Sequence, residues 1–325
     1  MSETHLPLIL RTHTLPQSWV TMLEGRCRQV VGPLDATCLA PELEAQLDQA
    51  EGLYTLLTIP ITEAILQKAP RLRVVSNMAA GVDNIDLAAC TRRGIPVGNT
   101  PGVLTEGTAD LTMALLLAVG RGLILANQDA RLGRWKTWSP TGWLGADLSG
   151  ATLGIIGMGK IGQAVAQRAA GFGMRIVYAD SQRSSCDDPN CLPLQDLLQQ
   201  SDFVSLHVPL TNETRGLIND QTLKLMKPTA ILVNAARGPV VDTAALVHAL
   251  STGQIAGAAL DVTDPEPLPP DHPLYSLPNC LVVPHIGSAT QNTRRRMAGL
   301  ACENLLAGLE GHPLPYCVNP QVYQR

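Results

Sequence analysis

The stretch TLGIIGMGKIG, residues 152–162, decides the fold, because a short apolar run passes directly into a pattern of three glycines. The run Thr152–Ile156 predicts a buried strand, and the following QAVAQRAAGFG has the apolar spacing of a helix. In this setting Gly157 permits a tight turn, Gly159 lets the backbone approach a pyrophosphate, and Gly162 lets the helix pack closely on the strand. The helix start also offers amide donors to phosphate oxygens. The stretch therefore predicts a dinucleotide-binding site at the edge of a parallel sheet.

Five more short apolar runs follow this stretch, with helical patterns between them. The predicted strands are Arg175–Tyr178, Phe203–His207, Ala230–Val233, Gly257–Leu260 and Leu281–Val283. A series of six strands that alternate with helices predicts a doubly wound parallel sheet of the Rossmann type.

The first third of the chain predicts a second parallel sheet, and 325 residues exceed the usual size of one hydrophobic core. Its strands are expected at Leu6–Leu10, Leu53–Ile59, Leu72–Ser76 and Ile95–Gly98, with helices at Thr62–Lys68 and Asp86–Arg93. Between the sheets we expect a buried helix over Glu106–Gly120, a polar helix to about Arg131 and a loop with three of the four tryptophans. A last helix, Asn292–Leu309, can return to the first domain. The predicted fold class is α/β, with two doubly wound parallel-sheet domains.

Composition and charge narrow the classes of function. Hydrophobic residues make up 45% of the chain and charged residues 16%, which is typical of a folded globular protein. A net charge of -4 favours no nucleic-acid partner, and Arg294–Arg296 is interpreted as a solvated helix face. The longest apolar run, Ala114–Val119, is too short to span a bilayer, and MSETHLPLIL does not resemble a signal peptide. We therefore expect no membrane association. The eight cysteines form no C-x-x-C pair, so we expect free thiols in a reducing cytoplasm and no metal site.

The choice between NAD and NADP depends on Asp180, which follows the second strand of the long series. A carboxylate there can accept both hydroxyls of an adenosine ribose and would repel a 2′-phosphate, which favours NAD. Ser181 and Arg183 follow, and an arginine can accommodate the extra phosphate, so NADP stays possible. The alternative interpretation of Asp180 is an ordinary loop acid.

Three chemically different side chains follow three successive predicted strands. Arg237 comes after the fourth strand, Glu266 after the fifth and His285 after the sixth, at the edge where a parallel sheet binds its ligand. A guanidinium can hold a carboxylate, and an imidazolium oriented by a second carboxylate can protonate a carbonyl oxygen as hydride reaches its carbon. Taken singly, the arginine could pair with Asp242, the glutamate could be solvated, and the histidine could belong to the core.

Four stretches together are recognisable: GMGKIG (157–162), NAARGPVVD (234–242), LDVTDPEPLP (260–269) and PHIGSAT (284–290). They resemble the D-isomer-specific 2-hydroxyacid dehydrogenases. Within that family, the chain looks most like the glyoxylate/hydroxypyruvate reductases over AAGVDNID (79–86), WKTWSPTGWLGADLSGATLGIIGMGKIG (135–162) and DVTDPEPLPPDHPL (261–274). The resemblance implies that Arg237, Glu266 and His285 are the catalytic trio. It also implies a homodimer, in which Trp138 or Trp143 reaches the active site of the partner.

The same resemblance implies a flavodoxin-like substrate domain, residues 1–100 and 291–325, with an NAD(P)-binding Rossmann domain, residues 101–290, inserted into it. The expected cofactor contacts are Thr108, Gly157, Gly159, Lys160, Ile161, Gly162, Asp180, Ser181, Arg183, Val208, Pro209, Thr214, Ala235, Ala236, Asp261 and Gly287. The expected substrate contacts are Ala80, Gly81, Val82, Arg237, His285 and Ser288.

The predicted activity is the reduction of small 2-oxo acids, such as glyoxylate and hydroxypyruvate, to D-2-hydroxy acids by hydride from NAD(P)H. Other D-2-hydroxyacid, phosphoglycerate and phosphite dehydrogenases are alternatives, but AAGVDNID adds no basic residue for a phosphorylated substrate. Formate dehydrogenases resemble the chain less, because they replace the glutamate of the trio by glutamine. The non-enzymatic alternative is an NAD(H)-sensing, corepressor-like binding protein, which only turnover distinguishes.

Overall fold

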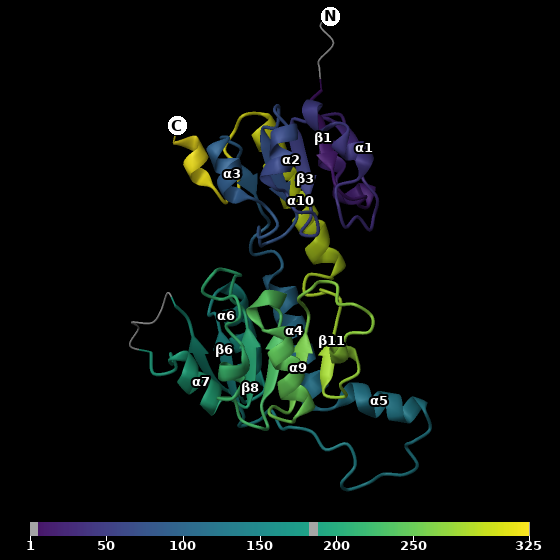
Figure 1. Cartoon of the computed structure of the whole chain (residues 1–325), viewed down its shortest axis with the longest axis vertical. Helices are drawn as coiled ribbons and strands as arrows, with labels where there is room; N and C mark the ends of the chain where they lie inside the picture. The colour runs from purple at the N-terminus through teal and green to yellow at the C-terminus, as the bar shows by residue number, and fades with distance from the viewer. Residues whose placement is uncertain (1–5, 182–187, 325) are drawn as a thin grey trace, which may run out of the picture. The chain divides into compact units, whose positions relative to one another are not determined.

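The computed structural model describes residues 6–181 and 188–324. The chain divides into two compact units, each built on a parallel sheet (Figure 1). Unit 1 consists of Met1–Leu104 and Thr290–Arg325, and unit 2 consists of Thr105–Ala289.

Unit 1 has a five-stranded sheet in the order β2-β1-β3-β4-β5, with every pair parallel. Its strands are β1 (Leu8–Arg11), β2 (Arg28–Val31), β3 (Gly52–Thr55), β4 (Val74–Asn77) and β5 (Val97–Gly98). This order is the flavodoxin-like one, which confirms the predicted fold class. The sequence did not predict β2, because this edge strand is only partly buried and has no clear apolar run.

All four strands predicted in unit 1 differ in their bounds from the observed ones. The strand expected over Leu72–Ser76 forms over Val74–Asn77, and that expected over Ile95–Gly98 forms over Val97–Gly98. The first strand was expected over Leu6–Leu10 and forms over Leu8–Arg11. The strand expected over Leu53–Ile59 ends at Thr55, because the chain turns there, with the Ile59 N–H donating to the Leu56 carbonyl, and Pro60 follows.

Helices cover both faces of the unit 1 sheet. They are α1 (Pro41–Glu44), α2 (Glu63–Lys68), α3 (Leu87–Arg92) and α10 (Gln291–Leu309), with short 3-10 helices η1 (Gln17–Trp19), η2 (Thr21–Leu23), η3 (Leu47–Gln49) and η6 (Pro320–Tyr323). The long helix α10 packs on β3 and β4, where a Cβ on Gly308 would lie 2.5 Å from the Val74 Cβ. The Tyr54 hydroxyl donates to the Ala298 carbonyl at 3.3 Å across the same contact.

Unit 2 has a six-stranded parallel sheet in the order β11-β10-β9-β8-β6-β7. Its strands are β6 (Thr152–Ile156), β7 (Arg175–Ala179), β8 (Phe203–Leu206), β9 (Ile231–Asn234), β10 (Gly257–Leu260) and β11 (Cys280–Val282). A parallel bridge between Tyr178 and Cys191 adds the remnant of one more strand beside β7, which gives the Rossmann order. The predicted strand Phe203–His207 was one residue too long, since β8 ends at Leu206 and His207 follows it.

The helices of unit 2 form layers on both faces of this sheet (Figure 1). They are α4 (Thr105–Gly120), α5 (Leu123–Arg131), α6 (Lys160–Gly171), α7 (Leu194–Gln200), α8 (Asp220–Leu223) and α9 (Thr243–Ser251), with η4 (Gly238–Val240) and η5 (Pro273–Tyr275). Helices α4 and α6 pack on one face, and α7, α8 and α9 pack on the other. Across residues 6–181 and 188–324, no single helix is long and apolar enough to cross a membrane, although α4 and α5 together would be and meet at a 61° bend.

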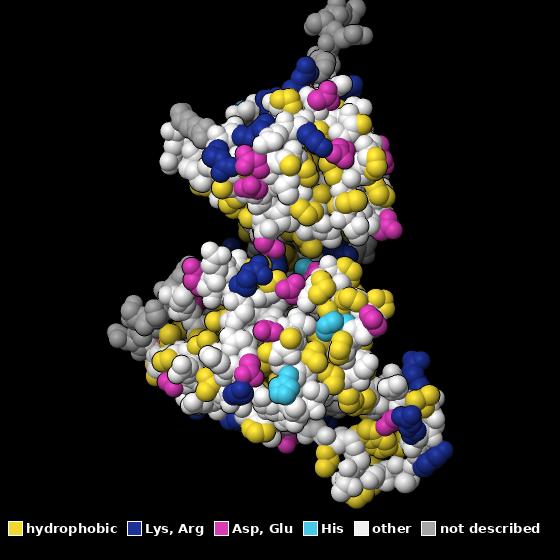
Figure 2. Space-filling model, in the orientation of Figure 1, with side chains coloured by type: hydrophobic (Ala, Val, Ile, Leu, Met, Phe, Trp, Pro, Cys, Tyr) yellow, Lys and Arg dark blue, Asp and Glu magenta, His cyan; other side chains and the backbone are white. Residues whose placement is uncertain are grey.

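An apolar arm, which we define as α5 and residues 132–144, projects from unit 2 at the lower right of Figure 1. No side chain of α5 is buried. The exposed large apolar residues of the arm are Leu123, Ile124, Leu125, Leu132, Trp135, Trp138, Trp143 and Leu144. Figure 2 shows apolar side chains beside basic ones on this projection.

Candidate active site

The glycine stretch forms a tight turn between β6 and α6 that only glycine can make at two positions. Gly157 has φ +95°, and a Cβ there would lie 2.7 Å from the His207 carbonyl oxygen. A Cβ on Gly162 would lie 2.2 Å from the Gly157 carbonyl oxygen, so the helix start packs directly on the turn. At Gly159, which precedes α6, a Cβ would meet no described atom within 4 Å. The turn thus has room at its outer side for the phosphates of a dinucleotide, beside the amide groups of the helix start.

Asp180 follows β7 and lies against the same turn. Its Oδ2 accepts a hydrogen bond from the Met158 backbone N–H at 2.8 Å, which fixes the carboxylate beside the glycine stretch. Ser181 is the next residue, and Arg183, which was expected to contact the cofactor, lies outside the described residues.

The three side chains of the predicted trio follow β9, β10 and β11. Because these strands are parallel neighbours, their carboxyl ends lie at one edge of the sheet. Arg237 follows β9, Glu266 follows β10 and His285 follows β11. The fold therefore brings the three positions to the edge at which parallel sheets bind ligands.

Glu266 and His285 form a close pair. Glu266 Oε1 lies 2.6 Å from His285 Nδ1, and its Oε2 accepts from the Thr263 backbone N–H at 3.2 Å. The side chains are 34% and 25% exposed, respectively, so both can be reached from solvent. Because the carboxylate holds Nδ1, the other ring nitrogen, Nε2, is the atom that can exchange a proton with a ligand.

The backbone at His285 is unusual, because its φ is +51°. Residues other than glycine rarely adopt this left-handed conformation, although histidine does so more often than most. The His285 N–H donates to the carbonyls of Asp261 at 2.9 Å and Val283 at 3.0 Å, which holds the conformation. Rare conformations of this kind gather at functional sites.

Glu266 stays ionised in this setting. Partial burial acts to raise its pKa, but the hydrogen bond and charge of His285, the Thr263 N–H and the charge of Arg237 outweigh burial. The pKa of Glu266 therefore lies below its ordinary value. A carboxylate held in the charged form stabilises an imidazolium beside it.

Asp261 holds the loop that carries His285. It is 2% exposed, and its two carboxylate oxygens accept from the backbone N–H groups of Ile286 at 2.6 Å and Gly287 at 2.9 Å. Burial raises the pKa of Asp261 despite these two donors. The sequence predicted Asp261 only as a cofactor contact. That it holds the backbone of the loop after His285 is known only from the structure.

Asn234, the last residue of β9, holds the loop of Arg237 and was missed from the sequence. Its side chain is buried, donates to the Arg237 carbonyl at 2.9 Å and accepts from the Ala236 N–H at 3.0 Å. Arg237 Nη1 in turn donates to the Ala236 carbonyl at 2.8 Å. A buried asparagine that ends an otherwise apolar strand was the signal available in the sequence.

The expected substrate loop Ala80-Gly81-Val82 lies after β4 in unit 1. Asn77 donates to the Gly81 carbonyl at 2.9 Å, and Asn99 donates to the Ala80 carbonyl at 2.7 Å. These two side chains fix the backbone of the loop, which is what recognition by backbone amides requires.

The other expected contacts of unit 2, apart from Thr108, lie in segments that follow its strands. Val208, Pro209 and Thr214 follow β8, and the Thr214 hydroxyl donates to the Pro209 carbonyl at 2.6 Å. Thr108 in α4 is buried, and its Oγ1 lies 3.3 Å from the point where a Cβ on Gly287 would lie. The remaining positions are Lys160 and Ile161 in α6, Ala235 and Ala236 after β9, and Ser288 after β11. No group of three or more His, Cys, Asp or Glu residues within the described ranges could hold a metal ion.

His207 gives unit 2 a pH-dependent stability. Burial lowers its pKa to about 4, its Nε2 bonds the Ser205 hydroxyl at 2.7 Å, and its buried Nδ1 has no partner among the described residues. Between pH 6.5 and about 4 the unfolded chain binds a proton that the folded chain does not. The stability present above pH 6.5 is therefore lost as the pH falls through this window, by about 3 kcal/mol in all.

We expect His207→Gln to flatten the loss of stability across this window. Urea unfolding followed by circular dichroism at several pH values between 4 and 7 measures the effect. His248→Gln, at an exposed position of α9, is the matched control and should keep the wild-type slope. An unchanged slope in His207→Gln would show that other groups cause the acid sensitivity.

Comparison with known proteins agrees with the fold and with the arrangement of the strand ends. Residues 113–287 match the family model described as the NAD-binding domain of D-isomer-specific 2-hydroxyacid dehydrogenases. The chain belongs to this family. The enzyme is therefore an oxidoreductase, and the matched part of unit 2 is its NAD- or NADP-binding domain.

Similar relatives of this dehydrogenase are named glyoxylate reductase. One from Korarchaeum cryptofilum is 46% identical over 321 residues, covering 97% of both chains. Another, from Aeropyrum pernix, is 51% identical over 282 residues, covering 84% of both chains.

Solved structures resemble the dehydrogenase over almost its whole length. A protein from Thermus thermophilus has a TM-score of 0.90 and 50% identity, covering 96% of this chain and 99% of its own. An NADPH-dependent glyoxylate/hydroxypyruvate reductase from Sinorhizobium meliloti, in complex with NADP and malonate, has a TM-score of 0.83 and 32% identity. That match covers 97% of this chain and 98% of the other.

Proposed function

We propose that this dehydrogenase reduces small 2-oxo acids, with glyoxylate and hydroxypyruvate as the first candidates, to D-2-hydroxy acids. The observation that carries the proposal is the pair of Glu266 Oε1 and His285 Nδ1, 2.6 Å apart, at the sheet edge that also bears Arg237. The names of the relatives support glyoxylate as a substrate. The charged, acceptor-only Glu266 and the proton-carrying His285 are groups that a carbonyl reduction needs.

Each residue of the trio has a defined part in the proposed reaction. The bound nicotinamide cofactor supplies the hydride. Arg237 holds the substrate carboxylate through paired hydrogen bonds. His285 Nε2 gives its proton to the substrate carbonyl oxygen, and Glu266 keeps the ring charged and oriented until then. In the reverse direction the same nitrogen accepts the proton.

Purified protein should oxidise NADH in the presence of glyoxylate or hydroxypyruvate. The same assay tests the alternatives, because a corepressor-like protein would bind NADH without turnover, and phosphoglycerate or phosphite dehydrogenases would prefer phosphorylated or phosphorus substrates. A panel of substrates distinguishes these alternatives. Small 2-oxo acids and 3-phosphohydroxypyruvate are assayed with NADH, and phosphite is assayed with NAD+. Absence of turnover with every 2-oxo acid would overturn the proposal.

We further propose that NADH is preferred over NADPH. Asp180, fixed at the glycine stretch by the Met158 N–H, would repel a 2′-phosphate and accept the hydroxyls of a ribose. The expected kcat/KM is about tenfold higher or more with NADH, and Asp180→Ala should reduce this ratio. Asp271→Ala, which removes an exposed carboxylate from another loop, is the control. A higher kcat/KM with NADPH in the wild type would contradict the role given to Asp180.

We propose a homodimer in which the apolar arm of each copy packs against the partner. The arm exposes more large apolar side chains than a free surface usually keeps, and such patches mark protein interfaces. Trp143 Nε1 donates to Asp129 Oδ2 at 3.0 Å, so this ring is tied to its own α5. Trp138, 79% exposed, is therefore the better candidate to reach the partner's active site.

Light scattering should give twice the 34.6 kDa mass of one chain for the wild type. The variant Ile124→Asp with Leu144→Asp should be monomeric, whereas Leu34→Asp, at an exposed apolar position of unit 1, should stay dimeric. Trp138→Ala should stay dimeric and raise the KM for the 2-oxo acid. A monomeric wild type would overturn the dimer. We also propose a reducing cytoplasm as the compartment, because the buried Cys27, Cys90 and Cys302 are free thiols.

A further inference from the structure

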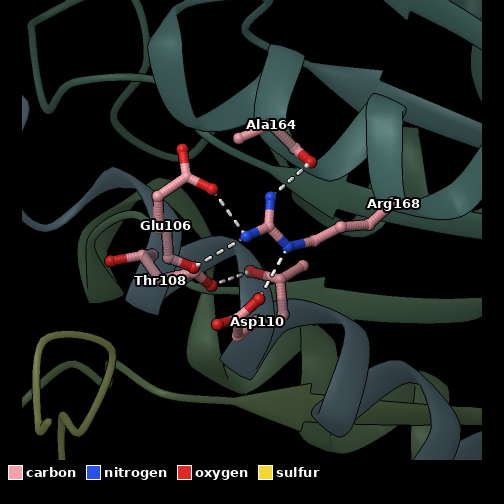
Figure 3. Close-up of polar contacts among 6 residues, drawn as sticks. Glu106, Thr108, Asp110, Ala164 and Arg168 are labelled. Carbon is pink, nitrogen blue, oxygen red and sulfur yellow. Dashed lines mark hydrogen bonds and ion pairs between the residues drawn. The ribbon is translucent and has the colours of Figure 1, made fainter.

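A cluster of charged side chains joins α6 to the first turns of α4 (Figure 3). Arg168 on α6 donates from Nη2 to Glu106 Oε2 and from Nε to Asp110 Oδ1, both at 2.7 Å. Its Nη1 donates to the Ala164 carbonyl at 3.0 Å, and Nη2 also reaches the Glu106 carbonyl at 3.5 Å. One guanidinium thus holds two carboxylates that lie one turn apart on the neighbouring helix.

This cluster differs from an isolated surface ion pair at its arginine, since the Glu106 and Asp110 side chains themselves are 75% and 69% exposed. An isolated exposed pair contributes little, because both side chains lose freedom and water screens the attraction. The Arg168 side chain is only 23% exposed, and all three of its guanidinium nitrogens donate hydrogen bonds. Its hydrogen bonds to Glu106 and Asp110 raise its pKa further, against the effect of burial. A single ordered guanidinium that binds at several points fixes the two helices in direction as well as in distance.

The two helices joined by Arg168 carry different parts of the expected cofactor site. Helix α6 begins at the glycine turn, with Gly159 immediately before it. Helix α4 carries Thr108 between the two carboxylates in sequence (Figure 3). The Thr108 carbonyl accepts from the Thr112 hydroxyl at 2.8 Å. The buried Thr108 side chain lies beside Gly287, in the loop that Asp261 holds. A shift of α4 along α6 would therefore move Thr108 relative to the glycine turn.

We propose that Arg168 is a positioning residue for the dinucleotide, which acts by clamping α4 to α6. The clamp keeps Thr108 and the glycine turn at the spacing that a bound cofactor requires. The inference rests on the proposed function, since it takes the dinucleotide to lie over the glycine turn. Arg168 itself does not touch the reacting atoms, so its loss should weaken cofactor binding and spare the chemical step.

The first test compares cofactor affinity with turnover in the full chain. Titration of NADH without substrate, followed by NADH fluorescence, should give a Kd about three- to tenfold higher for Arg168→Met. Its kcat at saturating NADH should stay within about twofold of the wild type. Arg168→Lys should be intermediate, because an ammonium keeps the charge without the fixed fork. Lys224→Met removes another exposed ion pair of unit 2, with Asp220 at 2.6 Å, and should leave the Kd unchanged.

The second test asks whether Arg168 acts through α4. Thr108→Val should weaken NADH binding in the wild type and add little in Arg168→Met, because the threonine is already displaced there. The double variant Glu106→Gln with Asp110→Asn should reproduce Arg168→Met, and it decides the matter if Arg168→Met does not fold. A wild-type Kd in the folded clamp variants, or fully additive losses with Thr108→Val, would overturn the positioning role. A wild type that binds neither NADH nor NADPH would instead overturn the proposed function.

Discussion

We expect His285→Ala to lower kcat for glyoxylate reduction by about 10²- to 10⁴-fold, the usual contribution of a positioned general acid. The substitution removes both the proton-carrying Nε2 and the Nδ1 that lies 2.6 Å from Glu266. The KM for NADH should change little, because no expected cofactor contact is lost. Steady-state NADH oxidation at varied glyoxylate and NADH measures these constants.

Two further variants test whether the loss of turnover comes from the general acid and not from a general effect of removing a histidine. His248→Ala removes an exposed histidine from α9 of the same unit and should keep wild-type turnover. Glu266→Gln keeps a side chain of the same shape but loses the charge that stabilises the imidazolium, so turnover in reduction should fall below that of the wild type. If His285→Ala retains the wild-type kcat, the proton comes from another group and the assignment is wrong.

The sequence predicted unit 2 well because its four central strands, β6, β8, β9 and β10, are buried throughout. Such strands read as continuous apolar runs, and β6 and β10 were predicted to the residue. The edge strand β2 was missed, because its residues are only partly buried and carry no such run. The neighbouring positions of Arg237, Glu266 and His285 followed from strand order alone, since the carboxyl ends of parallel strands share one edge.

Contacts between residues that are far apart in the sequence could not be predicted. The left-handed backbone of His285 depends on the Asp261 carbonyl, which comes from a different strand end. The clamp of Arg168 joins residues 58 and 62 positions apart in the chain, and nothing in the local pattern of α6 indicates it. Likewise, the spacing in the sequence did not distinguish Trp138 from Trp143 as the residue that contacts a partner. The hydrogen bond that Trp143 Nε1 donates to Asp129 Oδ2 is visible only in the structure.

The second large effect concerns two glycines of one turn. We expect the substitution Gly162→Ala to lower stability and Gly159→Ala to leave stability nearly unchanged. Gly162→Ala places a Cβ 2.2 Å from the Gly157 carbonyl oxygen, so backbone must move, and unfolding should become easier by about 2 kcal/mol. Gly159→Ala meets no described atom within 4 Å and has φ -74°, which suits any residue. Its stability should stay within about 0.5 kcal/mol of the wild type. Urea unfolding of both variants measures this contrast.

The same two variants should also differ in how they weaken NADH binding. In Gly159→Ala the added methyl group occupies the outer side of the turn, where close approach of a pyrophosphate is expected, so the Kd for NADH should rise roughly tenfold or more. In Gly162→Ala any loss of affinity should accompany the loss of stability, because the turn itself is displaced. A Gly159→Ala variant that is stable and binds NADH as tightly as the wild type would place the phosphates elsewhere. The pair thus tests separately whether the turn is built by Gly162 and whether the ligand lies against Gly159.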